Sequence, residues 1–149
     1  MQAYSLRRRA NAPIAVVFAV LADASGWSGW TRISETTLEH DGDSAPDGVG
    51  AIRLFRTGPI RSREQVTGYE PPAAGQARFA YRLLSGLPVK SYQAEVVLTA
   101  DGDATDIDWS ATFTPGPPGT RRLMAGFLRS TVGQIATGLV AEAERRAGT

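Results

Sequence analysis

The 149-residue sequence contains no cysteine and a single histidine. The absence of cysteine excludes disulfides, thiol nucleophiles and thiolate metal ligands, but it leaves the cellular compartment open. A histidine-based metal site or a Ser-His-Asp triad would depend on His40 alone, which precedes the turn sequence Asp41-Gly42-Asp43. We therefore expect His40 on a loop surface, and we expect no metal site.

The chain also lacks a charge excess and a long apolar run. Its 16 basic and 15 acidic residues give a net charge of +1, so the overall charge gives no reason to expect nucleic acid or an anionic membrane as partner. No segment approaches the length of about 20 apolar residues that a membrane span needs. The basic run Arg7-Arg8-Arg9 is interpreted as the solvent side of an edge strand rather than as a phosphate clamp, because three adjacent residues on a strand cannot share a face.

The N-terminus allows a second interpretation, a secretory leader. The basic run 7–9, the apolar stretch from Ile14 to Ala22 and the sequence Ala22-Asp23-Ala24 imitate the charged, apolar and cleavage regions of such a leader. Against this, Pro13 opens the apolar stretch, which is near the minimum length, and cleavage would remove the first strand and helix. We expect a cytoplasmic protein, with secretion left open.

Turn residues divide the chain into a regular series of elements within one domain, residues 1–149. A strand over 3–10 precedes a helix that starts at Pro13, and a short second helix or turn carries Trp27 and Trp30. Strands are predicted over 33–40, 49–56, 60–69, 77–84, 91–99 and 105–113, followed by a helix that ends near Arg146. This order predicts an α+β fold: a curved antiparallel sheet of six to seven strands wraps around the long C-terminal helix and leaves an internal cavity.

The sequence Asp101-Gly102 predicts a two-residue hairpin turn. In that register Tyr92 lies opposite Ala111, and Ala94 lies opposite Trp109. The apolar residues of both strands then share one face and the charged residues share the other. A slip of one residue would turn every side chain over, so the clean sorting of the two faces favours this pairing.

The sequence Gly58-Pro59 predicts a second tight turn, which sets Arg53 opposite Glu64 on the face that also carries Phe55. Two interpretations of this pair stay open, because Ile52 and Leu54 compete for the inward direction. A pair inside the cavity would offer a partner to a ligand's hydroxyl, carbonyl or carboxylate group. An exposed cross-strand pair would contribute under about 1 kcal/mol.

Aromatic side chains are the main candidates for a ligand-binding wall. Phe79 and Tyr81 alternate with arginines along their strand and should point inward, while Phe127 and Thr131 belong to an apolar stripe at helical spacing. Plain core packing is the alternative interpretation for each residue taken singly. The candidates for wall or rim of the cavity are Trp27, Trp30, Phe55, Phe79, Tyr81, Tyr92, Trp109, Phe127 and Thr131.

Five sequence pieces occur in the order of a known family. They are Ala12-Pro13 with Val17-Phe18 and Leu21-Ala22-Asp23; Trp27 with Trp30; Gly48 through Arg53; Arg63-Glu64 with Val66 and Tyr69 through Pro72; and Thr105 through Trp109 with Phe113 and Pro115. In these pieces the chain resembles the polyketide cyclase/dehydrase group of the START-related (SRPBCC) superfamily, whose members share a helix-grip fold. The resemblance implies a ligand cavity between sheet and C-terminal helix, and charged residues at the positions of Arg53 and Glu64. It implies no particular reaction, because relatives include lipid and hormone carriers, aromatase/cyclases and chaperone-interacting domains.

Three functions follow as hypotheses. The first is binding of a small, mostly apolar molecule of lipid or polyketide type, by a monomer or homodimer. The second is a cyclase or dehydratase without metal or organic cofactor, with Glu64 as general acid/base, Arg53 stabilising an enolate, and Tyr81 or Tyr92 donating a proton. The third is a partner-binding module that uses the outer face of the sheet.

Overall fold

The computed structural model describes residues 2–148. Its elements, in chain order, are β1 (Gln2–Ala10), α1 (Ile14–Ala22), the 3₁₀ helix η1 (Ala24–Gly29), β2 (Glu35–His40), β3 (Ile52–Thr57), β4 (Ile60–Ala73), β5 (Gln76–Ser85), β6 (Val89–Asp101), β7 (Ala104–Pro115) and α2 (Arg121–Ala147). The predicted series of elements is confirmed. One detail differs, because Pro13 caps the first helix in an extended conformation and the helix itself starts at Ile14.

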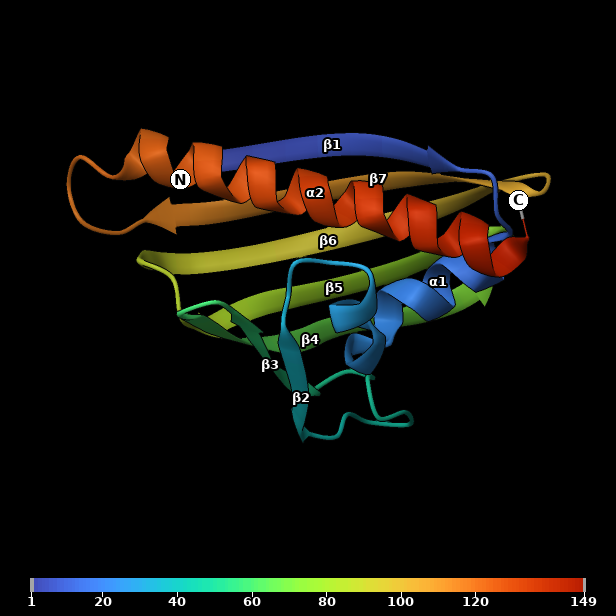
Figure 1. Cartoon of the computed structure of the whole chain (residues 1–149), viewed down its shortest axis with the longest axis horizontal. Coiled ribbons are helices and arrows are strands. Elements are labelled where there is room, and N and C mark those ends of the chain that lie inside the picture. Colours follow the sequence, from blue (N-terminus) through green and yellow to red (C-terminus); the bar gives the residue numbers. More distant parts are fainter. Residues whose placement is uncertain (1, 149) are drawn as a thin grey trace.

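The seven strands form one antiparallel sheet in the order β1-β7-β6-β5-β4-β3-β2. The sheet curves, and α2 lies lengthwise across its concave side, with α1 and η1 beneath the C-terminal half of α2 (Figure 1). This arrangement confirms the predicted helix-grip fold. It follows from the strand pattern, because alternate residues of β5, β6 and β7 are mainly apolar and need a covering layer on that face alone.

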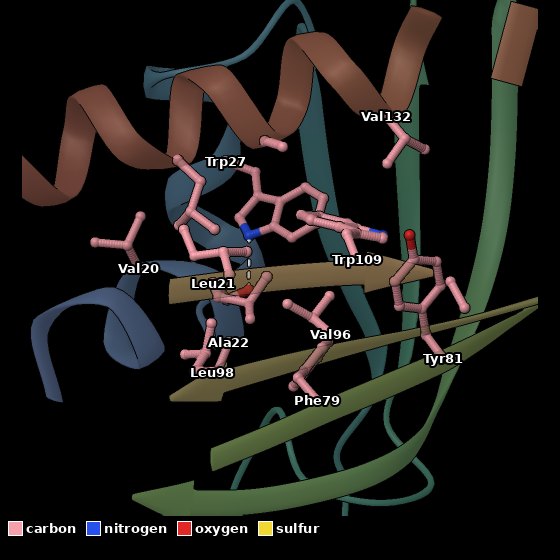
Figure 2. Close-up of a cluster of buried hydrophobic side chains, with 14 of the residues drawn as sticks. Val20, Leu21, Ala22, Trp27, Phe79, Tyr81, Val96, Leu98, Trp109 and Val132 are labelled. Atoms are coloured by element: carbon pink, nitrogen blue, oxygen red, sulfur yellow. Dashed lines mark hydrogen bonds between the residues drawn. The ribbon is translucent and has the colours of Figure 1, made fainter. Parts of the chain in front are cut away.

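The core lies between the concave face and the inner side of α2. The buried side chains of α2 recur at helical spacing and are Met124, Leu128, Val132, Ala136, Leu139 and Ala143. They face buried residues of the sheet, among which Phe79, Val96, Leu98 and Trp109 have essentially no exposed surface (Figure 2). Packing of the stripe, rather than helix propensity, therefore holds α2 in place.

Two glycines of α2 allow other segments to approach the helix closely. A side chain on Gly138 would meet the backbone oxygen of Trp30 at 2.7 Å, and one on Gly133 would lie 3.6 Å from the Arg8 guanidinium. A glycine inside a helix either allows another segment to approach closely or leaves room beside the helix. Gly138 receives the backbone of Trp30, the residue that follows η1, whereas only the end of the Arg8 side chain lies near Gly133, which lines the pocket described below.

The two hairpin predictions have different outcomes. The Gly58-Pro59 turn has the predicted register, with Arg53 opposite Glu64. The prediction of a turn at Asp101-Gly102 is wrong by one position. Gly102 and Asp103 form the turn, so Ala94 pairs with Ala111 instead of with Trp109. Gly102 has a φ of +61° and takes the first turn position, where glycine tolerates this conformation. Because the partners shift by two residues, every side chain keeps its predicted face.

Candidate functional site

A pocket with a volume of about 1000 Å³ lies between the concave face of the sheet and α2. Side chains from the sheet form its floor, α2 forms its roof, and the segment from Trp27 to Ile33 forms one side. The largest apolar and aromatic groups in its wall are Trp27, Trp30, Ile33, Phe55, Ile60, Tyr81, Leu83, Leu87, Tyr92, Phe127, Leu128 and Ile135. A volume of this size accommodates a drug-sized or lipid-like molecule.

Seven of the nine aromatic and helical candidates line this pocket: Trp27, Trp30, Phe55, Tyr81, Tyr92, Phe127 and Thr131. The other two, Phe79 and Trp109, are fully buried in the core beneath it. In Figure 2, Trp109 lies beside Tyr81, and the indole nitrogen of the one and the hydroxyl of the other point toward one another. Strand alternation predicted the inward face correctly but could not separate the layer that touches the pocket from the layer below it.

One end of the pocket floor is polar. Glu64 of β4 lines the floor together with Tyr81 of β5 and Tyr92 of β6. The hydroxyls of Tyr92 and Tyr4, which lies on β1, are 2.6 Å apart and form a hydrogen bond. Two tyrosines and a carboxyl group thus lie in the pocket floor, with the Tyr4 hydroxyl behind them, in a wall that also carries polar side chains such as Ser62 and Gln134.

Burial controls the acidity of this polar cluster. It raises the pKa of Glu64 to about 7, against the opposing influence of the nearby Arg53 charge. Burial also raises the pKa of Tyr4 to about 12, and it raises the pKa of Tyr81 and Tyr92 well above the ordinary value. Near neutral pH the tyrosines are therefore hydrogen-bond donors, and Glu64 can either give or accept a proton.

Arg53 lies behind the pocket wall rather than in it. Its guanidinium is fully buried among the rings of Trp27, Phe55 and Phe79, with centroids at 5.6, 5.3 and 5.0 Å. Rings at this distance stabilise a cation that is removed from water. The sequence left open whether Arg53 or its neighbours Ile52 and Leu54 point inward. In the structure Arg53 points inward, and Ile52 and Leu54 fall on the opposite face.

The carboxylate closest to Arg53 is an unexpected one. Nη1 of Arg53 lies 3.6 Å from Oδ1 of Asp47, while Glu64 acts on the guanidinium through its charge. Burial lowers the pKa of Arg53, and the two carboxylates oppose that effect; burial likewise raises the pKa of Asp47, against the attraction of Arg53. The arrangement is thus neither an isolated Arg53–Glu64 ion pair in the cavity nor an exposed one.

Sequence reasoning missed Asp47 and Tyr4. Asp47 belongs to the Asp/Gly-rich loop before β3, where no periodicity tells which side chain turns inward. Tyr4 could have been found, because it alternates with Leu6 and Arg8 on β1 and pairs with Ala111 of β7.

Two further features of residues 2–148 bear on the chemistry. No group of three or more histidine, aspartate and glutamate side chains in this range could hold a metal ion. None of the helices in the same range combines the length and the apolar character that crossing a bilayer requires.

The fold and the pocket define a helix-grip domain with a pocket between its sheet and its long helix. The family model described as "Polyketide cyclase / dehydrase and lipid transport" matches residues 1–146, and the chain belongs to that family. A search of curated proteins finds no match.

Solved structures from three bacteria share the fold. A START superfamily protein from Mycobacterium smegmatis has a TM-score of 0.79 at 12% identity, over 96% of this chain and 97% of its own. A protein from Thermus thermophilus has a TM-score of 0.74 at 14% identity, over 98% and 99% of the two chains. A protein from Thermobifida fusca has a TM-score of 0.74 at 21% identity, over 97% and 95%. At these identities the likeness extends to the fold alone.

Proposed function

We propose that the protein binds a small, mostly apolar molecule of lipid or polyketide type in the pocket beneath α2. The observation that carries this proposal is the pocket of about 1000 Å³ whose wall holds aromatic and aliphatic side chains from the sheet, the segment after η1 and α2. An apolar guest would remove that surface from water, which contributes about 25 cal/mol for each Å² buried. The lipid transport named in the family description is consistent with such a guest.

The polar end of the floor would orient the guest. Glu64, Tyr81 and Tyr92 can bind a hydroxyl or carbonyl group, while Phe55 and Leu83 contact the apolar body. A few convergent polar groups in an apolar wall are the usual source of specificity in small-molecule sites. We therefore expect a ligand with one oxygen-bearing end.

Filling the pocket tests the proposal. We expect Thr131→Trp to weaken binding of an anilinonaphthalene sulfonate probe at least about tenfold. Thr131 lines the roof of the pocket, and the indole ring would occupy the volume that the guest needs. The control is Thr99→Trp, an exposed threonine on β6 outside the pocket wall. Fluorescence titration of both variants and the wild type gives the comparison. Equal affinity in all three proteins would refute a site beneath α2.

A second candidate is a dehydratase or cyclase reaction in the same pocket. The observation that favours it is the pKa of Glu64, about 7, beside the protonated hydroxyls of Tyr81 and Tyr92. A carboxylate of that pKa is suited to remove the proton next to a carbonyl, while a tyrosine protonates the departing hydroxyl, so that water and an alkene form. Arg53 would act through its charge on Glu64, since it does not line the pocket.

Glu64→Gln separates the two candidates. If the pocket is catalytic, this variant should have no dehydratase activity on a β-hydroxyacyl thioester and should still bind the fluorescent probe. Unchanged turnover in Glu64→Gln would refute the assignment of Glu64 as the general acid/base. Absence of turnover in the wild type, with binding intact, would leave the binding function alone.

A further inference from the structure

The basic residues without an ion pair concentrate at one end of the molecule. Three segments meet there: residues 56–62 around the β3–β4 turn, residues 84–91 around the β5–β6 turn, and residues 115–130 at the start of α2. All three lie at the same end of the long axis, on the left in Figure 1. We call these three segments the basic apolar end.

Backbone contacts show that the three segments adjoin one another. Gly86, with a φ of +116°, lies so close to the carbonyl oxygen of Arg61 that a side chain there would clash. Gly116 is pressed in the same way against the carbonyl oxygen of Pro88. The pocket joins them as well, because Ile60, Leu87 and Phe127 all line it.

Charge is distributed unevenly between this end and the rest of the chain. The basic apolar end contains no acidic residue and six basic ones, which are Arg56, Arg61, Lys90, Arg121, Arg122 and Arg129. The remaining ten basic residues stand against all 15 acidic residues. Arg56 forms an ion pair with Glu35 at 3.5 Å, and within residues 2–148 no carboxylate lies within 4.0 Å of the other five. The net charge of +1 thus conceals a strongly positive end.

The same end exposes most of the large apolar side chains found on the surface. Of the five that are more than about a third exposed in the described chain, four belong to it: Ile60, Leu84, Leu123 and Phe127. Leu123 is 76% exposed and Phe127 is 40% exposed, and the two are one helical turn apart on α2. Exposed apolar side chains and unpaired basic residues both strengthen binding to the interface of an anionic membrane.

We propose that the basic apolar end docks on an anionic lipid bilayer. Arg121 and Arg122 contact lipid phosphates, and the neighbouring Leu123 enters the acyl boundary. Phe127 belongs to both the docking surface and the pocket wall, so docking places the pocket against the lipid phase. The surface fits lipid better than an acidic protein because its exposed apolar side chains, Leu123 above all, stand among unpaired basic residues, a combination that the interface of an anionic bilayer accepts.

Flotation with vesicles tests the docking independently of any pocket ligand. We expect the wild-type protein to bind vesicles of mixed phosphatidylglycerol and phosphatidylcholine, and to bind pure phosphatidylcholine far more weakly. Each basic residue near such a surface strengthens binding about fivefold, so Arg121→Gln/Arg122→Gln should weaken it about 25-fold. Leu123→Ser should weaken it at least about tenfold through the loss of apolar burial.

Matched controls remove the same groups elsewhere. Arg7→Gln/Arg145→Gln takes two charges from exposed positions on β1 and at the C-terminal end of α2, and Val49→Ser shortens an exposed apolar side chain outside the basic apolar end. Both controls should bind within about twofold of the wild type if location matters more than total charge. Equal loss in test and control variants would overturn the proposal. No binding of the wild type to anionic vesicles would also overturn it, and the positive end would then fit an acidic protein surface instead.

Discussion

The stability of the protein should depend on pH through Glu64. This residue lies in the floor of the pocket, where burial raises the pKa of its carboxyl group to about 7 from a usual value of 4.5. Arg53 opposes the shift without cancelling it. Replacing Glu64 by glutamine removes the titrating proton and leaves a side chain of nearly the same shape.

The sign follows from proton binding in the two states. Between about pH 4.5 and 7 the carboxyl is ionised in the unfolded chain and protonated in the folded one, so the folded state binds more protons. Stability contributed by Glu64 is therefore greatest at low pH and falls as pH rises through this window. At about 1.4 kcal/mol for each pKa unit, the wild type should lose about 3 kcal/mol relative to Glu64→Gln across it.

Urea denaturation of both proteins between about pH 5 and 8 measures this difference. The free energy of unfolding of Glu64→Gln, minus that of the wild type, should rise by about 2 to 3 kcal/mol over the range. The control is Glu39→Gln, because Arg63 holds the pKa of Glu39 below its usual value and this carboxyl stays ionised in both states above about pH 5. A constant difference for Glu64→Gln would refute the raised pKa of Glu64.

Three other predictions concern packing and the buried polar groups. Gly138→Ala should lower the free energy of unfolding in spite of the better helix propensity of alanine, since the new Cβ would meet the backbone of Trp30 at 2.7 Å. The control is Gly126→Ala, which has open space around it and should raise the free energy of unfolding by about 0.5 to 1 kcal/mol in the same urea assay. Tyr4→Phe and Tyr92→Phe should each cost about 1 to 3 kcal/mol, and in a double-mutant cycle the double variant should cost less than their sum because they share one hydrogen bond. Arg53→Ala should cost about 3 to 5 kcal/mol by calorimetry, since it leaves a cavity among three rings and removes the ionic partner of a half-buried aspartate; a loss under about 1 kcal/mol would contradict the buried position.

Much of the fold could be predicted from the sequence because its signals are local. Period-two alternation and turn residues located the strands, and an apolar stripe at helical spacing located α2. The error in the turn at Gly102 did not change the predicted faces, because a shift of two residues keeps every side chain on its face. Local sequence signals were therefore enough to predict which side chains of the sheet point inward.

The site was harder to predict because it depends on depth and on loops. Alternation predicts that Phe79 and Trp109 point inward, but only the path of α2 decides that both lie below the pocket rather than in its wall. Asp47 reaches Arg53 from an irregular loop, which carries no periodic signal. The pairing of β1 with β7 brings Tyr4 close to Tyr92 of β6, and these two tyrosines are 88 positions apart in the sequence.

The central claim is that the space beneath α2 holds an apolar guest. Native mass spectrometry tests it most directly, with the wild type and Thr131→Trp each incubated with a long-chain fatty alcohol. We predict a complex of one alcohol per wild-type chain and a marked loss of that complex in the variant. Equal amounts of complex in the two proteins, or none in either, would contradict the claim.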